Sequence, residues 1–340
     1  TAIPKMKICY VTSIYDEKST YRETLFINFL KDTNKDFQVY FFKGKKNNDS
    51  RFHKCLGLSK RDFFIFMSTK FVIEKYEIII VSDLRQIAPI FFIFLKFFSS
   101  SKIIIEHEQR SAGLTLFGVL ATFFLFPLSL LAFWRANLIR SPNVYSTNYL
   151  EKFPFIKHKI LEIPLVANKA NIPSNNSELK KKIIFTSGKR FFSKGGDLIL
   201  KIIFHNPHLN LKIITNCKLN IHAKNIIEIS KFQNIKEFLT EASQCNLAIY
   251  LSPSQSFYDV AAIGLKVIVD VNSLPRTKKV NLENFIPLKL ETDKQGNVIN
   301  NYENFKIINS CISSHINDKN CGHSYKFTAK QLLEFYIDFV

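Results

Sequence analysis

The chain has 340 residues, of which 46% are hydrophobic and 22% are charged, and its formal net charge is +19. This length predicts two domains of ordinary size, and this hydrophobic content excludes an intrinsically disordered chain. The excess of lysine and arginine favours a polyanionic partner, which is a nucleic acid, an anionic lipid surface or a phosphorylated substrate. Because the sequence has no zinc-finger spacing, no RNA-binding aromatic signature and no basic arm, we expect no nucleic-acid partner.

Apolar runs of strand length alternate with helical patterns through the first half of the chain. Strands are predicted at residues 7–11, 37–42, 77–81, 102–105, 136–140 and 159–163. Helices are predicted at residues 21–30, 62–73 and 87–98. Strands that alternate with helices in this way predict a parallel, doubly wound sheet.

Residues 112–134 contain no charged side chain, and Arg110 and Arg135 flank them. The run is long enough to span a bilayer, which takes about 20 residues. Pro127 interrupts it, however, and a span would place strands of one sheet on opposite sides of the membrane. Two interpretations remain: helices buried in the first domain, or a helical hairpin whose apolar face enters the membrane surface. The segment has no polar stripe, so we favour membrane contact.

A polar stretch at 174–182 separates this half from a second series of strands and helices. The second series has strands predicted at residues 183–185, 211–215, 226–229, 247–251 and 267–271. Helices are predicted at residues 235–242, 257–263 and 328–339. The sequence therefore predicts an α/β protein of two Rossmann-like, doubly wound domains facing a cleft. We place the first domain at 1–166, the second at 167–325, and a last helix at 326–340 that packs back on the first domain.

The loop that follows the predicted strand 183–185 combines small residues with cations. Gly188, Lys189, Arg190 and Lys194 precede an apolar helical run that begins after Asp197. Backbone N–H groups at a helix N-terminus and the helix dipole attract an anion, and the cations add charge, so the pattern favours a phosphate site. The alternative is a surface loop whose lysines only reflect a lysine-rich composition.

A second loop of this kind follows the strand at 247–251. Ser252, Ser254 and Ser256 stand at the start of the next helix, where hydroxyls cap a helix or bond a diphosphate. Asp259 is predicted in the first turn of that helix, where its carboxylate can accept from vicinal hydroxyls. The alternative is plain capping, together with an acidic residue that suits the helix dipole.

These two loops resemble those of nucleotide-sugar glycosyltransferases of the GT-B fold, especially the retaining, GT4-like group. That group carries Gly-Arg-x-x-x-x-Lys-Gly, and this chain has Gly188-Lys-Arg-Phe-Phe-Ser-Lys-Gly195. The resemblance implies that Lys194, with Lys189 or Arg190, holds the donor diphosphate, and that Asp259 replaces the glutamate that binds the donor ribose.

The chain also departs from the family pattern. The loop between Pro253 and Asp259 is several residues short and lacks the glutamate that touches the donor sugar. No glycine-rich loop follows the first predicted strand, where residues 13–21 contain no glycine. Because the missing glutamate touches the donor sugar in the family, the resemblance does not identify the sugar.

His107 follows the strand 102–105, where the family often has a histidine that faces the cleft. Polar residues at the carboxyl end of such a strand are site candidates. We assign His107 and Glu108 to catalysis, with Glu108 or Glu106 as a base if the enzyme inverts, and Ser19, Thr20 and Arg110 to the acceptor. The alternative is a hydrogen-bonded histidine beside solvated charges. A separate alternative for Arg110 is that it anchors the apolar run at lipid phosphates.

Six cysteines stand at irregular spacings with no CxxC pair, which favours reduced thiols in a cytosolic protein over disulfides or a metal site. No apolar signal region precedes the first predicted strand, so secretion is not expected. We therefore expect a cytoplasmic protein peripherally associated with the inner face of the cell membrane.

Together, the residues and the resemblance predict a bacterial-type GT-B glycosyltransferase that is retaining and metal-independent. It is expected to need no cofactor besides its nucleotide-sugar donor. The expected acceptor is a lipid-linked, lipopolysaccharide or capsule-type glycan at an anionic membrane surface. The alternatives are an enzyme similar to nucleotide-sugar 2-epimerases and a non-catalytic scaffold of the same fold at the membrane.

Overall fold

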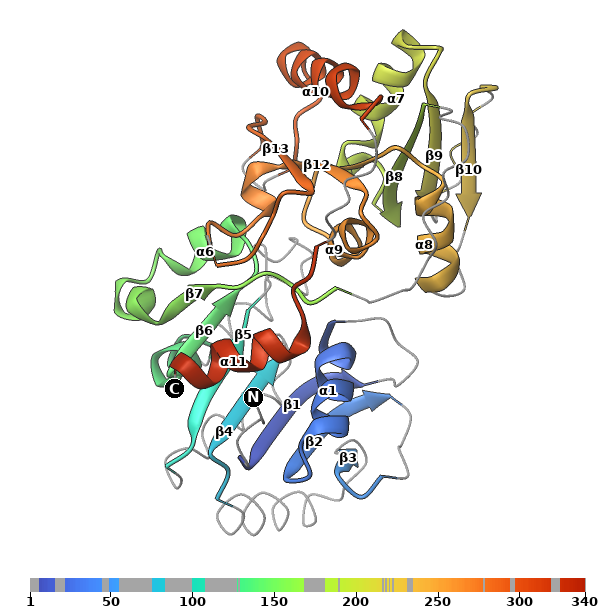
Figure 1. Ribbon diagram of the computed structural model, residues 1–340. Coiled ribbons are helices and arrows are strands. Elements are labelled where there is room, and N and C mark those ends of the chain that lie inside the picture. The colour runs from blue at the N-terminus through green and yellow to red at the C-terminus, as the bar shows by residue number, and fades with distance from the viewer. Residues whose placement is uncertain are drawn as a thin grey trace. The chain divides into compact units, whose positions relative to one another are not determined.

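The computed structural model of the chain contains two compact units (Figure 1). Unit 1 comprises Thr1–Val166 and Thr328–Val340, and unit 2 comprises Ala167–Phe327. The residues that the structure describes are 6–15, 22–44, 49–54, 75–82, 100–107, 127, 129–167, 181–188, 190–215, 217, 219, 221, 223–230, 235–277, 279–293, 297–318 and 325–339.

A parallel sheet of seven strands forms the centre of unit 1, in the order β3-β2-β1-β4-β5-β6-β7. Its strands are β1 (Ile8–Tyr15), β2 (Phe37–Gly44), β3 (Phe52–Lys54), β4 (Ile78–Ser82), β5 (Lys102–Glu106), β6 (Leu138–Ser141) and β7 (Ile160–Glu162). Its described helices include α1 (Arg22–Thr33), α6 (Val144–Leu150), the 3₁₀ helix η3 (Pro154–Lys159) and α11 (Ala329–Phe339). The central strands are mostly apolar, as in β4 (IIIVS), because both faces of a parallel sheet are covered.

Unit 2 has a parallel sheet of six strands in the order β10-β9-β8-β11-β12-β13. Its strands are β8 (Lys182–Gly188), β9 (Asn210–Thr215), β10 (Ile226–Ser230), β11 (Leu247–Tyr250), β12 (Lys266–Asp270) and β13 (Phe285–Leu288). Its described helices are η4 (Phe192–Lys194), α7 (Gly196–His205), α8 (Ile235–Ser243), α9 (Gln255–Ala262), η5 (Val271–Ser273) and α10 (Tyr302–His315). Both sheets follow the Rossmann strand order, so the predicted fold class of two doubly wound α/β domains is confirmed.

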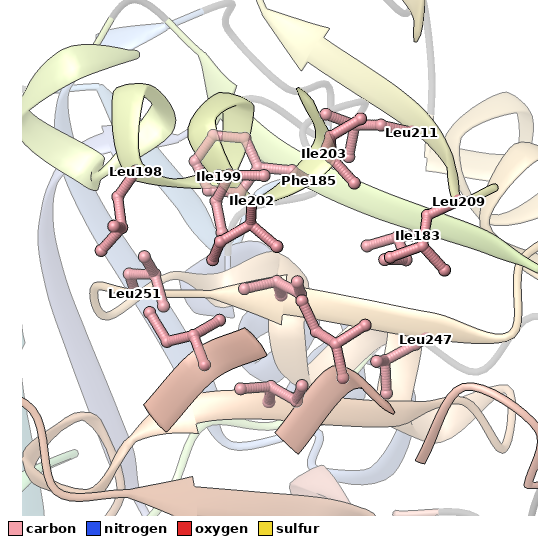
Figure 2. Packing of buried hydrophobic residues seen from close by; sticks show 14 of the residues in the cluster. Ile183, Phe185, Leu198, Ile199, Ile202, Ile203, Leu209, Leu211, Leu247 and Leu251 are labelled. Carbon is pink, nitrogen blue, oxygen red and sulfur yellow. The ribbon is translucent and has the colours of Figure 1, made fainter. Parts of the chain in front are cut away.

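The core of unit 2 fixes α7 on the sheet. Figure 2 shows Ile199 and Ile202 of α7 beside Phe185 of β8, and all three side chains are buried. The apolar residues of α7 recur at helical spacing and form one buried face. This packing sets the position of the loop that joins β8 to α7.

The C-terminal helix α11 belongs to unit 1, although unit 2 separates it from the rest of unit 1 in the sequence. Tyr336 of α11 is fully buried and packs edge-on against Phe26 of α1, with 5.8 Å between ring centroids. The amphipathic pattern of residues 328–339 therefore marks a helix that buries one face.

The uncharged run 112–134 is described only at residue 127 and from residue 129 onward. Its described end is helical and leads toward β6; Ala132 and Phe133 lie in the core of unit 1, whereas Trp134 is exposed. In the described part of the chain, no helix is both long and apolar enough to cross a membrane. The predicted helices 62–73 and 87–98, and most of the polar stretch 174–182, lie outside the described residues.

Candidate functional site

Two loops of unit 2 leave the sheet at the carboxyl ends of neighbouring strands. β8 pairs with β11 in parallel register, with Phe185 opposite Ile249. The sheet continues through β9 and β10 on one side of this pair and through β12 and β13 on the other. The strand order therefore reverses between β8 and β11, and the carboxyl edge at such a reversal is where ligands bind in open α/β sheets.

The loop that follows β8 carries the predicted cations. Gly188 is the last residue of β8, and a register shift between Thr186 and Gly188 breaks the regular pairing with β9. The chain then turns, with the Arg190 amide donating to the Ser187 carbonyl at 3.3 Å. Arg190 is exposed and Lys194 is half-buried. Both cations therefore precede the N-terminus of α7, where a phosphate is expected to bind.

Two successive glycines let this loop pack closely. Gly195 has a φ of 78°, in the left-handed region that favours glycine, and a Cβ there would lie 2.8 Å from Cδ1 of Leu251. A Cβ on Gly196 would lie 2.5 Å from the buried ring of Phe191. The first loop is thus held against its own aromatic anchor and against the end of β11.

Some backbone donors of this loop are already used. The Gly195 amide donates to the Phe192 carbonyl at 2.9 Å, and the Gly196 amide donates to the Phe191 carbonyl at 3.0 Å. These two amides are therefore already bonded within the loop and are not among the N–H groups that the pattern offers to an anion.

The loop that follows β11 presents hydroxyls at the start of α9. Ser254 occupies the N-cap position with extended backbone, yet its side chain makes no capping hydrogen bond. Its Oγ lies 2.9 Å from Oγ of Ser256 instead. The α9 N-terminus is therefore left without a side-chain cap, and the plain capping interpretation does not account for Ser254.

Polar groups from β8, β11 and α9 converge beside this loop. The Tyr250 hydroxyl donates to Oγ1 of Thr186 at 3.2 Å. Burial raises the pKa of Tyr250, and hydrogen bonds with Ser256 and Thr186 oppose that rise. Asp259 is buried, and its negative charge adds to the rise in the pKa of Tyr250.

This cluster corrects one prediction and adds two residues. Asp259 lies in the second turn of α9, because the helix begins at Gln255 rather than at residue 257. Thr186 and Tyr250 were not predicted as site residues. The available signal was that both residues lie near the carboxyl ends of predicted strands. That signal points to a shared site only when the order of the strands in the sheet is known.

His107 lies directly after β5 in unit 1 and is buried. Its ring stacks on Tyr149 with 5.7 Å between centroids and meets Phe133 edge-on at 5.3 Å. Its amide donates to the Arg140 carbonyl at 2.9 Å. Aromatic rings therefore hold the imidazole in place at the carboxyl end of its strand.

Glu106, considered as a base, is instead part of a buried network. The Tyr10 hydroxyl donates to it at 2.6 Å, Arg140 pairs with it at 2.8 Å, and the Tyr336 hydroxyl also donates to it. Arg140 further donates to the Pro164 carbonyl at 2.5 Å. A carboxylate with these partners serves the structure of unit 1 rather than proton transfer.

Several predicted site residues lie outside the described part of the chain: Ser19, Thr20, Glu108, Arg110 and Lys189. Within the described part, no group of three histidine, cysteine, aspartate or glutamate side chains could hold a metal ion. Among the cysteines that the structure describes, Cys9, Cys217, Cys245 and Cys311 form no disulfide. Burial raises the pKa of Cys245 to about 12 and that of Cys311 to about 11, so neither thiol is reactive at neutral pH.

Solved structures of two kinds resemble the whole chain. Anabaena HepE in complex with UDP matches with a TM-score of 0.63 and 12% identity over 98% of this chain and 100% of that chain. The lipopolysaccharide outer core galactosyltransferase WaaB matches with a TM-score of 0.62 and 10% identity over 98% and 99% of the two chains. The UDP-GlcNAc 2-epimerase of Methanocaldococcus jannaschii matches with a TM-score of 0.53 and 13% identity over 98% and 100%.

The chain has the GT-B fold. No family model matches the sequence, and no curated protein does so either. At 10–13% identity these likenesses show the fold and leave the activity open.

Proposed function

We propose that the chain is a glycosyltransferase that moves a sugar from a UDP-sugar donor to a hydroxyl of a lipid-linked, lipopolysaccharide or capsule-type glycan. The observation that carries the proposal is the pair of loops at the strand-order reversal of unit 2. In one loop, Arg190 and Lys194 precede the N-terminus of α7. In the other, Ser254 and Ser256 lie at the N-terminus of α9, which has no side-chain cap.

The proposed chemistry is electrostatic at the leaving group. Negative charge develops on the departing diphosphate as the glycosidic bond breaks, and cations fixed beside it lower the barrier. Arg190 and Lys194 would supply this charge, together with Lys189 and the positive end of the α7 dipole. The proposal assigns the reaction no metal and no cofactor besides the donor.

The remaining roles are assigned to both units. Asp259 would accept hydrogen bonds from the donor ribose, and Ser254 and Ser256 would donate to the diphosphate. His107 and Glu108 would act at the reacting hydroxyl, and Ser19, Thr20 and Arg110 would position the acceptor. Retention of configuration and peripheral binding to the cytoplasmic membrane face are parts of the same proposal.

The deciding experiment uses Lys194→Ala with Lys201→Ala as the matched control. Lys201 is an exposed lysine on α7, farther along the same helix. Release of nucleotide from a panel of nucleotide sugars should fall at least about a hundredfold in Lys194→Ala, since loss of one transition-state contact costs this much, and should stay unchanged in Lys201→Ala. Equal activity of the two variants would refute the phosphate assignment.

A second candidate is a nucleotide-sugar 2-epimerase, which the likeness to the Methanocaldococcus enzyme favours. The two reactions differ in their need for an acceptor. Without an acceptor, the sugar of a UDP-sugar should keep its configuration if the chain is a transferase, whereas an epimeric UDP-sugar would form if it is an epimerase. A scaffold without a donor site would show no thermal stabilisation by any nucleoside diphosphate.

A further inference from the structure

Aromatic and basic side chains gather on one surface of unit 1. Trp134 is 51% exposed and Phe155 is 44% exposed, whereas the other exposed large apolar side chain in the described part of this unit is Phe339 on α11. Phe155 lies on η3, which leads into β7, and Trp134 lies just before β6. The aromatic–basic surface consists of Trp134, Phe153 and Phe155 with Arg135, Lys152, Lys157 and Lys159.

Direct contacts hold this surface together. Strands β6 and β7 are paired, with Ile139 opposite Ile160, so the segments that enter them are neighbours. The Lys159 ammonium donates to the Trp134 carbonyl at 2.5 Å and so links η3 to the end of the uncharged run. Phe153 and Phe155 are in contact, with 6.3 Å between their ring centroids.

The charges around the rings are arranged toward solvent. The Arg135 guanidinium lies over the Trp134 ring, 4.9 Å from its centroid. Lys152 and Lys157 are exposed, whereas Glu151 and Glu162, the acidic residues of the same segment, are half-buried. The surface therefore presents exposed rings at Trp134 and Phe155 and exposed positive charge at Lys152 and Lys157.

The surface is connected through packed rings to His107. Phe153 contacts Tyr149 with 5.9 Å between centroids, and Tyr149 stacks on His107. His107 in turn meets Phe133, the residue before Trp134. The rings of the aromatic–basic surface are thus in contact with the rings that hold His107.

We infer that the aromatic–basic surface docks on an anionic lipid bilayer, an inference that rests on the proposed use of a lipid-linked acceptor. Tryptophan and other amphipathic rings settle at the headgroup level of a bilayer, and lysines beside them are attracted to anionic headgroups. The sequence supports the same partner, because the uncharged run 112–134 ends at Trp134.

The chain has a single tryptophan, so Trp134 reports on this surface directly. Tryptophan emission should shift to shorter wavelength when the full chain is titrated with vesicles of phosphatidylcholine and phosphatidylglycerol. The shift should be much smaller with pure phosphatidylcholine, it should weaken as salt is raised, and brominated lipid should quench the emission.

Two pairs of variants test which side chains are responsible. Lys157→Gln should bind the anionic vesicles about fivefold more weakly, whereas Lys35→Gln, the same change at an exposed lysine before β2, should bind as the unaltered chain does. Phe155→Ala should bind about tenfold more weakly, and Phe339→Ala on α11 should not. All four residues are exposed, so each variant should keep the circular dichroism of the folded chain.

Other results would overturn the inference. If the emission is unmoved by anionic vesicles while UDP still raises the melting temperature, the surface does not bind lipid and the donor site stands. If the emission shifts with protein concentration alone, a second copy of the chain covers the surface. Equal losses in Lys157→Gln and Lys35→Gln would mean that binding reflects net charge only.

Discussion

The carboxyl edges of the two sheets place charge in opposite ways. In unit 1, Glu106 at the end of β5 is buried and paired with Arg140 of β6. In unit 2, Arg190 is exposed in the loop that follows β8, and the N-terminus of α9 has no side-chain cap. Both edges belong to the same type of sheet, so topology alone does not identify a binding edge. The two edges differ in whether the charged side chains at the strand ends are already paired with an opposite charge of the protein.

The largest expected effect comes from disrupting the buried hydrogen-bond network around Glu106 in unit 1. Arg140→Met leaves the buried Glu106 carboxylate without its cation and should cost about 3–5 kcal/mol in the free energy of unfolding. Urea unfolding followed by Trp134 emission measures this effect, because the single tryptophan lies in unit 1.

The double variant Glu106→Leu with Arg140→Met provides the control for this prediction. Removal of both charges should recover part of the loss, since apolar replacement of a whole buried pair is close to neutral. Affinity for UDP should be unchanged in both variants, because the donor loops belong to unit 2. A single variant as stable as the unaltered chain would show that the network does not stabilise unit 1.

The next effect concerns the packing of the loop between β8 and α7, at the carboxyl edge of the sheet in unit 2. In Gly196→Ala the new methyl group would overlap the Phe191 ring, and overpacking of this kind costs about 1–3 kcal/mol. The loop must then shift, so affinity for UDP in calorimetry should fall at least about tenfold. Adding Phe191→Leu should restore part of the affinity, and no loss of affinity in Gly196→Ala would mean that the loop does not bind the nucleotide.

A smaller effect is expected at Asp259, the buried carboxylate near the carboxyl edge of the sheet in unit 2. Asp259→Ala should reduce the preference for UDP over 2′-deoxy-UDP by about tenfold, the worth of a hydrogen bond to a charged group. A purely structural role would weaken both nucleotides equally. The ratio of the two dissociation constants therefore separates ribose recognition from support of Tyr250.

The smallest effect is expected at a pair that serves neither edge. Hydrogen bonds from Arg51 lower the pKa of Asp49 to about 2. A folded-state pKa below the unfolded value stabilises the fold above the unfolded pKa, and this stability is lost as pH falls through about 2. Asp49→Asn should cost no more than about 1 kcal/mol at neutral pH, because the pair is near the surface, and should cost nothing at pH below 2 in urea unfolding.

Most strands were predictable from sequence because a buried parallel strand is an apolar run between turn residues. The short edge strands β3 and β13 were not predicted. The predicted run 211–215 became β9 and the predicted run 102–105 became β5, each within one residue. Helix α10 was not predicted. It buries Asn304, whose side chain bonds the carbonyls of Glu291 and Ile299, and a buried asparagine does not register in a hydrophobic pattern.

The positions of the candidate site residues were predictable where they depend on local order along the chain. Arg190, Lys194 and Ser254 follow strands directly, so their sheet edge could be inferred. The role of Glu106 could not, because its partners include Tyr336, 230 positions away in the sequence. The prediction of the turn of α9 that holds Asp259 depended on where the helix begins. Helix boundaries are the part of a sequence pattern that is hardest to predict.

The placement of α11 has a consequence for synthesis on the ribosome. Residues 167–327 form unit 2 as one continuous stretch, whereas unit 1 needs Thr328–Val340 as well as Thr1–Val166. Unit 2 can therefore complete its fold while the first 166 residues still lack the helix that carries Tyr336. During that interval Glu106 and Arg140 have each other but not the Tyr336 hydroxyl, and the apolar face that α11 will cover is a natural place for a chaperone to bind.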